Sequence, residues 1–438
     1  MKKLRHEIRD AIHGFVEFDN LERELIDSQP MQRLKYIHHL AMSYQIYPGA
    51  THSRFEHSLG VMELATRIFD SVFREDKISA LIKERIGEYI QEDQIQSWRR
   101  IVRLAGLLHD VGHLPFSHAT ENLLPAGWSH EKLTSEIIKK SEIAKILQEK
   151  LRKKAVQDII DIATDFRKRK KDPLTPWKTL LNEMITGNSF GADRMDYLIR
   201  DSHHAGVTYG RFDPVKLIEG LRIVIDTETD EIALGLEYNS IHCAEALLLA
   251  RYFMYSQVYF HRVRNIYDAH LEEYLKKKLP GGYFPTEWKE ILKITDNEIL
   301  IEMREAALDE KNKLHKYAER LLCRKHFKTV YQMNPLHKKK CPTIFDDLVK
   351  YLKKELGEDN VIERKKDPKS ESNDFPVFVN ENEIERAFHI SNVIKNIPSV
   401  EFGLIFVPDR VREKGKNMVE GKIKKLISGE VGNGVAGP

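Results

Sequence analysis

The amino-acid sequence predicts a mostly α-helical protein with a small β-hairpin and a C-terminal α+β region. Apolar residues recur at helical spacing up to about residue 217. Residues 222–226 and 231–237 are rich in Ile, Val and Leu and are separated by Thr-Glu-Thr-Asp, which is typical of a hairpin. Residues 375–379 and 400–407 are further strand-like runs. We therefore predict three regions: a helical core over 1–218, the hairpin and long helices over 219–330, and the α+β region with a flexible tail over 331–438.

The composition excludes several classes of protein. Of 438 residues, 41% are hydrophobic and 31% are charged, as in globular proteins with two or three packed regions. The net charge of +3 predicts no dominant polyanion partner. Cys243, Cys323 and Cys341 lie far apart, which argues against a disulfide framework or a cysteine-based zinc site. The N-terminus has no apolar signal core, and the longest apolar stretch, 241–260, contains charged residues, so we expect a cytoplasmic protein without membrane association.

The first predicted helices surround a Tyr-Pro-Gly-Ala turn. Residues 24–40 carry apolar side chains at roughly helical spacing. After the turn, Ser-Arg-Phe-Glu is a capping-box pattern that begins a helix over 54–73. Arg54 and His57 therefore lie three residues apart on one face of the first turn of this helix.

A His-Asp pair lies at the end of another apolar helix. Residues 101–109 are apolar at helical spacing, and Gly112 and Pro115 end the helix. The last turn then presents His109 and Asp110 at the edge of a core. Ten of the 19 histidines fall in the first 130 residues, which indicates that the chemistry is built at this end of the chain.

The second half of the chain is predicted to combine long helices with short strands. One helix is expected over 240–278 and more helix over 296–326. Residues 335–375 are basic and are expected to be rich in loops. A short helix near 411–427 precedes a Gly-rich tail at 429–438, which we expect to be disordered.

Four residues from three segments form a set of candidate metal ligands: His57, His109, Asp110 and Asp193. Imidazole and carboxylate together suit one divalent transition metal, Mn, Fe, Ni or Zn, with Mg as a further candidate. Such a metal polarises a phosphoryl group and lowers the pKa of a bound water from ~15.7 toward ~7. A single buried histidine is more often a core residue, but three segments that each supply a ligand favour a metal site.

A second group of histidines follows the His-Asp pair. His113 shares the helical face of His109. His118 and Glu121 lie three residues apart, which suits a general acid whose ring is oriented by a carboxylate. His130 begins another helix. Surface or helix-cap roles for His118 and His130 are equally compatible with the sequence.

Five segments, in this order, carry a resemblance to a known family. They are Arg-Leu-Lys-Tyr-Ile at 33–37, Tyr-Pro-Gly-Ala-Thr-His-Ser-Arg-Phe-Glu-His-Ser-Leu-Gly-Val at 47–61, Leu-Leu-His-Asp-Val-Gly-His-Leu-Pro-Phe-Ser-His at 107–118, His-Glu at 130–131, and Asp-Arg-Met-Asp-Tyr-Leu-Ile-Arg-Asp-Ser-His-His-Ala-Gly at 193–206. Over residues 5–270 the chain resembles the HD-domain deoxynucleoside triphosphate (dNTP) triphosphohydrolases.

This resemblance implies an HD-domain helical core and hydrolysis of a dNTP to deoxynucleoside and inorganic triphosphate, by attack of water at the α-phosphorus. The four candidate ligands would hold the metal, and residues 219–330 would complete the active site. Arg54 would bind the phosphates, as would Arg194, which stands where the family usually has Lys. His118, oriented by Glu121, would protonate the leaving 5′ oxygen, and His113 and His130 would contact the triphosphate. Tyr197, Asp201 and Tyr259 would line the sugar and base pocket.

One departure concerns recognition of the sugar. Where the family commonly has Gln, which reads the 3′-hydroxyl, this chain has His39, which keeps a hydrogen-bond donor. Two alternatives therefore stay open. The first is an HD phosphohydrolase acting on a cyclic, signalling or monophosphate nucleotide. The second is a nucleotide-sensing or nucleic-acid-binding protein that uses the basic runs 167–171, 337–340 and 364–366, although no aromatic residues interleave there.

The resemblance also implies a homo-oligomer, a dimer or tetramer, with a nucleotide effector at a subunit interface. Asp27, Gln32 and Lys35 fall in the segment that would line the effector site, with Lys35 where Arg is usual. An exposed, charged helix face is the alternative interpretation of these three residues.

Overall fold

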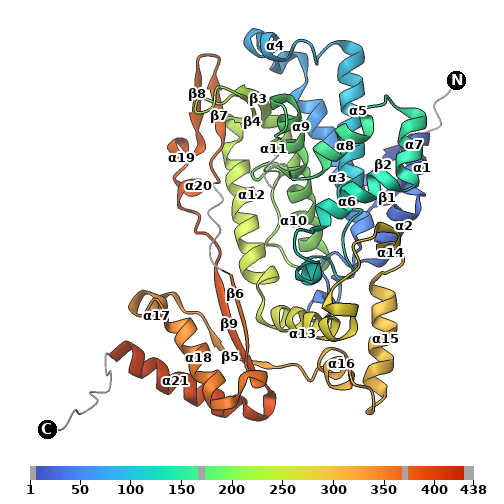
Figure 1. Ribbon diagram of the computed structural model, residues 1–438. Helices are drawn as coiled ribbons and strands as arrows, with labels where there is room; N and C mark the ends of the chain where they lie inside the picture. Colours follow the sequence, from blue (N-terminus) through green and yellow to red (C-terminus); the bar gives the residue numbers. More distant parts are fainter. Residues whose placement is uncertain (1–5, 166–172, 367–372, 429–438) are drawn as a thin grey trace. The chain divides into compact units, whose positions relative to one another are not determined.

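The computed structural model describes residues 6–165, 173–366 and 373–428, and it is mostly α-helical as predicted (Figure 1). The predicted tail at 429–438 and the basic run at 167–171 lie outside the described residues. Contacts divide the chain into two compact units. The first comprises Met1–Tyr255, Tyr283–Ile299 and Glu371–Pro398, and the second comprises Ser256–Gly282, Leu300–Ser370 and Ser399–Pro438.

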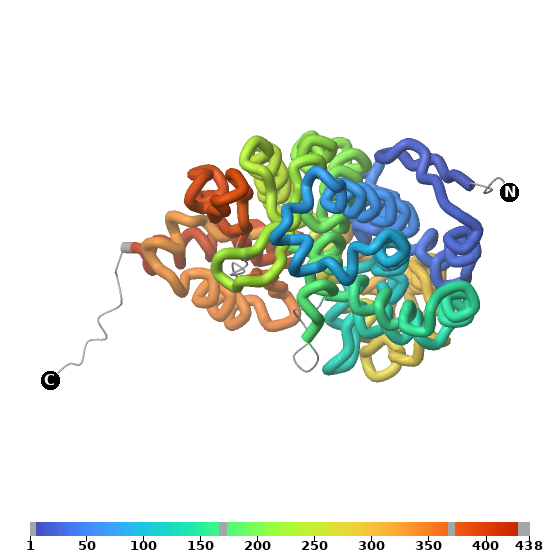
Figure 2. Tube along the Cα trace, turned by 90° about the horizontal axis from the view of Figure 1, so that it is seen from above, coloured from blue at the N-terminus to red at the C-terminus, as the bar shows by residue number. Residues whose placement is uncertain are grey.

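The first unit begins with a β-hairpin that the sequence patterns did not predict. β1 (His6–Asp10) pairs antiparallel with β2 (Gly14–Phe18). Asp10 closes the turn, because its Oδ1 accepts hydrogen bonds from two backbone N–H groups of the turn at 2.9 and 2.8 Å. Both strands contact α3 (Arg54–Val72), and Figure 2 shows the dark-blue hairpin segment beside the lighter-blue helices.

The prediction of a single helix over 24–40 is wrong. The segment is divided into α1 (Asn20–Ile26), α2 (Gln29–Arg33) and a 3-10 turn at Leu34–Tyr36. Pro30 explains the division, because it lacks a backbone N–H group and cannot continue α1, whereas it fits the first turn of a new helix.

α3 is the central helix of the first unit. It begins at the predicted capping box, in which the side chains of Ser53 and Glu56 bond to each other's backbone N–H. α3 packs on α5 (Glu92–Leu108) and α10 (Ala192–Ala205). Further helices of this unit are α4 (Ala80–Ile86), α6 (His130–Lys140), α7 (Glu142–Lys150), α8 (Ala155–Ala163), α9 (Pro176–Thr186), α11 (Pro214–Gly220), α12 (Ile241–Met254), α14 (Trp288–Ile291), α19 (Ala387–Ile390) and α20 (Asn392–Asn396).

The predicted hairpin forms one edge of a four-stranded sheet. β3 (Leu221–Ile225) and β4 (Ile232–Glu237) pair antiparallel, which confirms the prediction. β4 then pairs in parallel with β7 (Pro376–Asn380), and β7 pairs antiparallel with β8 (Glu383–Arg386). A late segment of the chain therefore completes the sheet of the first unit.

The long helix predicted over 240–278 is interrupted. α12 (Ile241–Met254) passes into a π-helical turn at Tyr255–Tyr259, and α13 (Arg262–Lys278) begins after a break. His261 caps α13, because its Nδ1 accepts a hydrogen bond from the N–H of Val263 at 3.2 Å. This side-chain cap satisfies a backbone N–H group at the start of α13, so a new helix begins here instead of a continuation of α12.

The second unit contains a three-stranded sheet in the order β5-β9-β6. The prediction that 335–375 is rich in loops is wrong, because this segment contains two helices and a strand. The apolar face of α18 supplies buried residues to the core cluster beside the sheet. Among the described residues, no helix is long and apolar enough to cross a membrane. The elements are α15 (Asp296–Leu308, whose first turn lies in the first unit), α16 (His315–Leu322), β5 (Lys328–Gln332), α17 (Pro335–Lys340), α18 (Ile344–Leu356), β6 (Ile362–Lys366), β9 (Phe402–Val407) and α21 (Arg412–Ser428).

Candidate metal centre

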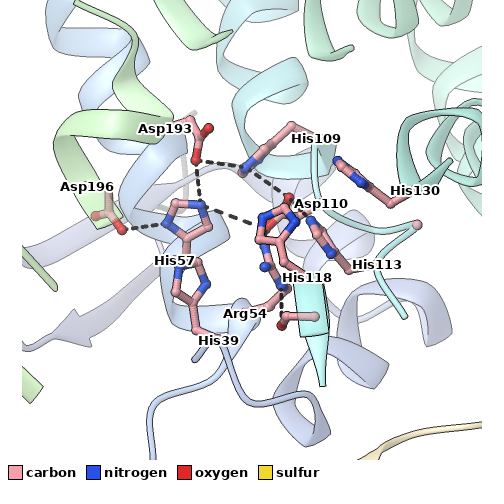
Figure 3. Close-up of polar contacts among 12 residues, drawn as sticks. His39, Arg54, His57, His109, Asp110, His113, His118, His130, Asp193 and Asp196 are labelled. Carbon is pink, nitrogen blue, oxygen red and sulfur yellow. Dashed lines mark hydrogen bonds and ion pairs between the residues drawn. The ribbon is translucent and has the colours of Figure 1, made fainter. Parts of the chain in front are cut away.

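The ends of three helices bring the four predicted metal ligands together (Figure 3). His57 lies in the first turn of α3, and Asp193 lies in the first turn of α10. His109 is the C-terminal cap of α5, and Asp110 follows it. Two histidines and Asp110 are buried, whereas the side chain of Asp193 is 37% exposed, so the cluster opens to solvent on one side.

The donor atoms of the four residues face one another at short range. Nε2 of His57 lies 3.0 Å from Oδ1 of Asp193 and 3.8 Å from Oδ2 of Asp110. Nε2 of His109 lies 3.3 Å from Oδ1 of Asp110 and 3.8 Å from Oδ1 of Asp193. His57, His109 and Asp193 place donor atoms close enough together to hold one divalent cation, and Asp110 forms a second such group with His57 and His39.

The hydrogen bonds of His109 fit a metal ligand. Its Nδ1 donates to the carbonyl oxygen of Gly106 at 2.8 Å, which leaves the lone pair on Nε2. That Nε2 is buried and makes no hydrogen bond to any described residue. A buried polar atom without a partner costs free energy, and a cation between Nε2 and the carboxylates would remove this cost.

The charges of the cluster also fit a cation. Burial lowers the pKa of His57, but hydrogen bonds to Asp193 and Asp196 outweigh burial and raise it to about 10. Burial alone would raise the pKa of Asp110, yet the Arg54 guanidinium holds it well below its usual range. Without a metal, a proton on His57 supplies positive charge between carboxylates, and a divalent cation can take its place.

A second cluster adjoins the first and contains His113, His118, His130 and Glu121. Glu121 accepts hydrogen bonds from Nδ1 of His118 at 3.2 Å and from Nδ1 of His130 at 2.5 Å. The rings of His113 and His130 stack with centroids 4.2 Å apart. Burial lowers the pKa of His130, but the Glu121 carboxylate outweighs burial and raises it. The structure therefore brings together all four residues that the sequence singled out here.

Comparison with known proteins identifies the family. Residues 54–201, which include all four candidate ligands, match the HD domain, and residues 216–400 match the HD associated region. The chain belongs to the HD-domain family. Its family and its buried His-Asp cluster are those of a metal-dependent phosphohydrolase.

The HD chain resembles both characterised and uncharacterised proteins. It is 29% identical to an uncharacterized protein of Methanocaldococcus jannaschii, over 96% of this chain and 83% of that protein. It is 31% identical to the deoxynucleoside triphosphate triphosphohydrolase SAMHD1 of Homo sapiens, over 60% of this chain and 43% of that protein. The chain thus spans less than half the length of SAMHD1.

Solved structures share the fold of the HD chain. A hypothetical protein from Aquifex aeolicus is 32% identical, with a TM-score of 0.78 over 95% of this chain and all of that one. A phosphohydrolase from Bacteroides thetaiotaomicron shares the fold with a TM-score of 0.68 at 23% identity.

Arg54 contacts the HD aspartate directly. Its Nη1 forms a buried ion pair with Asp110, and its Nε donates a hydrogen bond to Oγ of Ser117 at 2.8 Å. Ser117 and Phe116 have φ values of +57° and +58°, a strained left-handed conformation. Asp296 secures this turn by accepting a hydrogen bond from the N–H of Phe116 at 2.7 Å. Sequence patterns did not single out these two residues. Ser117 meets Arg54 only because its backbone is in a left-handed conformation, and Asp296 bonds to a residue that is far away in the sequence.

Four of the predicted substrate-binding residues lie in the first unit. Nε2 of His39 lies 3.7 Å from Oδ1 of Asp201, and the same carboxylate oxygen accepts a hydrogen bond from Nε2 of His52 at 2.7 Å. Nε and Nη1 of Arg194 are buried without a hydrogen bond to any described residue. Burial raises the pKa of Tyr197, which keeps its hydroxyl protonated. The substrate-binding roles assigned to these four residues stay predictions.

The remaining predicted site residues are Tyr259 and the three residues of the predicted effector site. Tyr259 belongs to the second unit, and its role in a base pocket stays a prediction. Asp27 and Lys35 are exposed, and Lys35 donates a hydrogen bond to Gln32 at 2.8 Å. Asp27 pairs with Arg23 at 3.5 Å. An effector site formed by these residues stays a prediction. The alternative interpretation, an exposed and charged helix face without a ligand, stays open as well.

Gly60 gives a first test of how tightly this centre is packed. A Cβ at this position would lie 1.9 Å from Oδ1 of Asp196 and 2.5 Å from Nη2 of Arg200. Gly60→Ala is therefore expected to lower the free energy of unfolding by about 1–3 kcal/mol, measured by urea denaturation. Gly421→Ala is the matched control, because a Cβ at this glycine of α21 meets no atom within 4 Å. It should raise helix stability by about 0.5–1 kcal/mol, and equal effects of the two changes would contradict the packing argument.

Proposed function

We propose that the chain hydrolyses deoxynucleoside triphosphates to deoxynucleoside and inorganic triphosphate. The observation that carries the proposal is the shared position of Asp110. Its Oδ1 lies 3.3 Å from Nε2 of His109 and 3.2 Å from Nε2 of His113. One carboxylate thus joins the metal cluster to the second histidine cluster, so groups suited to a polyphosphate lie directly beside groups suited to a metal.

The metal, when bound, would supply a Lewis acid and a water of lowered pKa. His57, His109, Asp110 and Asp193 would hold it. A protonated His130, supported by Glu121, would face the phosphates together with His113, and Arg54 and Arg194 would add guanidinium groups. His118, whose Nδ1 is bonded to Glu121, would give its proton to the leaving 5′ oxygen. Tyr197, Asp201 and His39 would line the nucleoside pocket.

The test is product analysis over a nucleotide panel. With Mn²⁺, we expect at least one dNTP to yield triphosphate and deoxynucleoside in equal amounts, as measured by anion-exchange and reversed-phase chromatography. The same protein after chelation is the control. Release of pyrophosphate or of single phosphates would overturn the assigned scissile bond. A second dNTP added as activator, with sedimentation of the protein in both conditions, tests the proposed effector control and homo-oligomer.

A second candidate function is hydrolysis of a different nucleotide by the same centre. The observation that favours it is the hydrogen bond from His52 to Asp201, because the carboxylate expected to line the sugar pocket already has a partner. Including ribonucleotides, monophosphates and cyclic dinucleotides in the panel separates the two candidates. Salt-sensitive nucleic-acid binding that survives loss of the metal ligands would instead support the nucleic-acid alternative.

A further inference from the structure

A buried network of hydrogen bonds lies behind the metal ligand His57. Oδ2 of Asp196 accepts hydrogen bonds from Nδ1 of His57 at 2.8 Å and from Nε of Arg200 at 2.8 Å. Oδ1 of Asp196 accepts from Nε2 of His13 at 2.6 Å and from Nη2 of Arg200 at 2.9 Å. Arg200 in turn donates to both oxygens of Asp10, at 2.8 and 3.2 Å. The side chains of His57, Asp196 and Arg200 are completely buried.

This network links the N-terminal hairpin, which supplies no ligand, to the metal centre. Asp196 lies three residues after Asp193 on α10, so one helix supplies a ligand and the group that orients another ligand. Asp10 is the last residue of β1 and His13 lies in the turn before β2, so the N-terminal hairpin reaches the same carboxylate. Gly60 is required beside Asp196, because any larger residue would displace the carboxylate.

We propose that Asp196 is a positioning residue for the metal centre and that the N-terminal hairpin supports it through Asp10 and His13. A carboxylate that accepts from Nδ1 of His57 fixes the orientation of the ring and directs Nε2 toward Asp193. It also increases the basicity of the ring as a ligand. The inference rests on the proposed metal centre but not on the nucleotide that the enzyme cleaves.

Asp196→Asn tests the proposal, with metal affinity as the readout. Both carboxylate oxygens of Asp196 accept hydrogen bonds, whereas an Asn side chain has only one oxygen that can accept. The change therefore weakens the hold on the His57 ring but leaves His57 itself in place. We expect Mn²⁺ or Co²⁺ to bind about 10- to 100-fold more weakly, as measured by isothermal titration calorimetry on the full chain. The Co²⁺ absorption spectrum, which reports ligand geometry, should change as well.

Asp158→Asn is the matched control. Asp158 is also a buried carboxylate, on α8, and it forms ion pairs with Arg152 and Lys178, both at 2.7 Å. Both changes are expected to lower the thermal stability of the metal-free protein, but only Asp196→Asn should weaken metal binding. Unchanged metal affinity in Asp196→Asn would refute the positioning role and leave Asp196 as a structural residue.

His13→Leu tests the hairpin separately and also applies if Asp196→Asn does not fold. It removes one hydrogen bond to Asp196 and leaves those from His57 and Arg200, so we expect metal affinity to fall several-fold, less than in Asp196→Asn. An unchanged affinity would refute the contribution of the hairpin. If the wild-type chain itself binds no divalent ion, the metal centre and the proposed function fail together, which is distinct from failure of the inference alone.

Discussion

His109→Ala is expected to abolish hydrolysis and metal binding while changing the stability of the metal-free protein only slightly. Nε2 of His109 makes no hydrogen bond to any described residue, so the change removes no hydrogen bond at this atom of the metal-free fold. The change removes the hydrogen bond from Nδ1 to Gly106, which contributes about 1 kcal/mol. Triphosphate release and metal content measure the loss of function, and urea unfolding with a chelator measures stability.

Asp110→Ala provides the contrast, because it should abolish both activity and much of the stability. Asp110 is the ion-pair partner of Arg54, whose side chain is only 3% exposed. Removing the carboxylate leaves a buried guanidinium without its counter-ion, which costs about 3–5 kcal/mol. Equal stability losses in the two variants would contradict this difference in roles.

Metal removal gives the third arm of the same experiment. A ligand present at 100 times its Kd stabilises a fold by about 2.7 kcal/mol. We therefore expect Mn²⁺ to raise the unfolding temperature of the wild-type protein and to restore its activity after chelation. His109→Ala should show neither response. A full response in this variant would mean that the ion binds elsewhere.

Local patterns were sufficient to predict the helices that carry the ligands. The capping box before Arg54 and the apolar run that ends at His109 depend only on neighbouring residues, and both predictions are confirmed. The hairpin formed by β3 and β4 is predictable for the same reason, because two alternating runs and a polar turn lie within 17 residues, Leu221 to Glu237.

Features that depend on long-range contacts could not be predicted. Asp296 bonds to the backbone of Phe116, 180 residues away, and nothing in its neighbourhood indicates this. The N-terminal hairpin is short and polar, and its importance comes from the contact between His13 and Asp196. Asp196 itself carried a signal, because it lies one helical turn after Asp193, but a spacing of three residues is common on any polar helix face.

The charge of the second histidine cluster could be predicted only in part. Residue types alone suggested that His118 and Glu121 form a pair. The structure adds that Glu121 also accepts a hydrogen bond from His130 and thereby raises the pKa of His130. This sharing depends on the position of α6, which brings His130 beside the turn that carries Glu121.

Glu121→Gln is expected to lower kcat by about 10²- to 10⁴-fold, the range associated with loss of general acid catalysis. The amide no longer supplies the charge that orients His118 and holds a proton on His130. Steady-state kinetics on the best nucleotide of the panel measure the effect. Glu131→Gln is the control, because Glu131 lies 3.5 Å from Nε2 of His130 on the same helix and contributes less to the raised pKa of His130. An equal loss of kcat in both variants would indicate a general effect of charge instead of support for an acid.

The pH dependence of stability tests the same pair without a substrate. The pKa of His130 is raised in the folded protein, so the pair stabilises the fold fully below the unfolded value of about 6.5. This contribution is lost as the pH rises through the folded pKa. The difference in unfolding free energy between the wild-type protein and Glu121→Gln, both metal-free, should therefore be largest between about pH 4.5 and pH 6.5 and should narrow at higher pH. It should also narrow below about pH 4.5, because burial raises the pKa of Glu121 but its hydrogen bonds to the two histidines outweigh burial and lower this pKa in the folded protein. If the difference instead widens as the pH rises above about 6.5, Glu121 does not stabilise the protonated form of His130. The loss of kcat in Glu121→Gln would then be assigned to His118 alone.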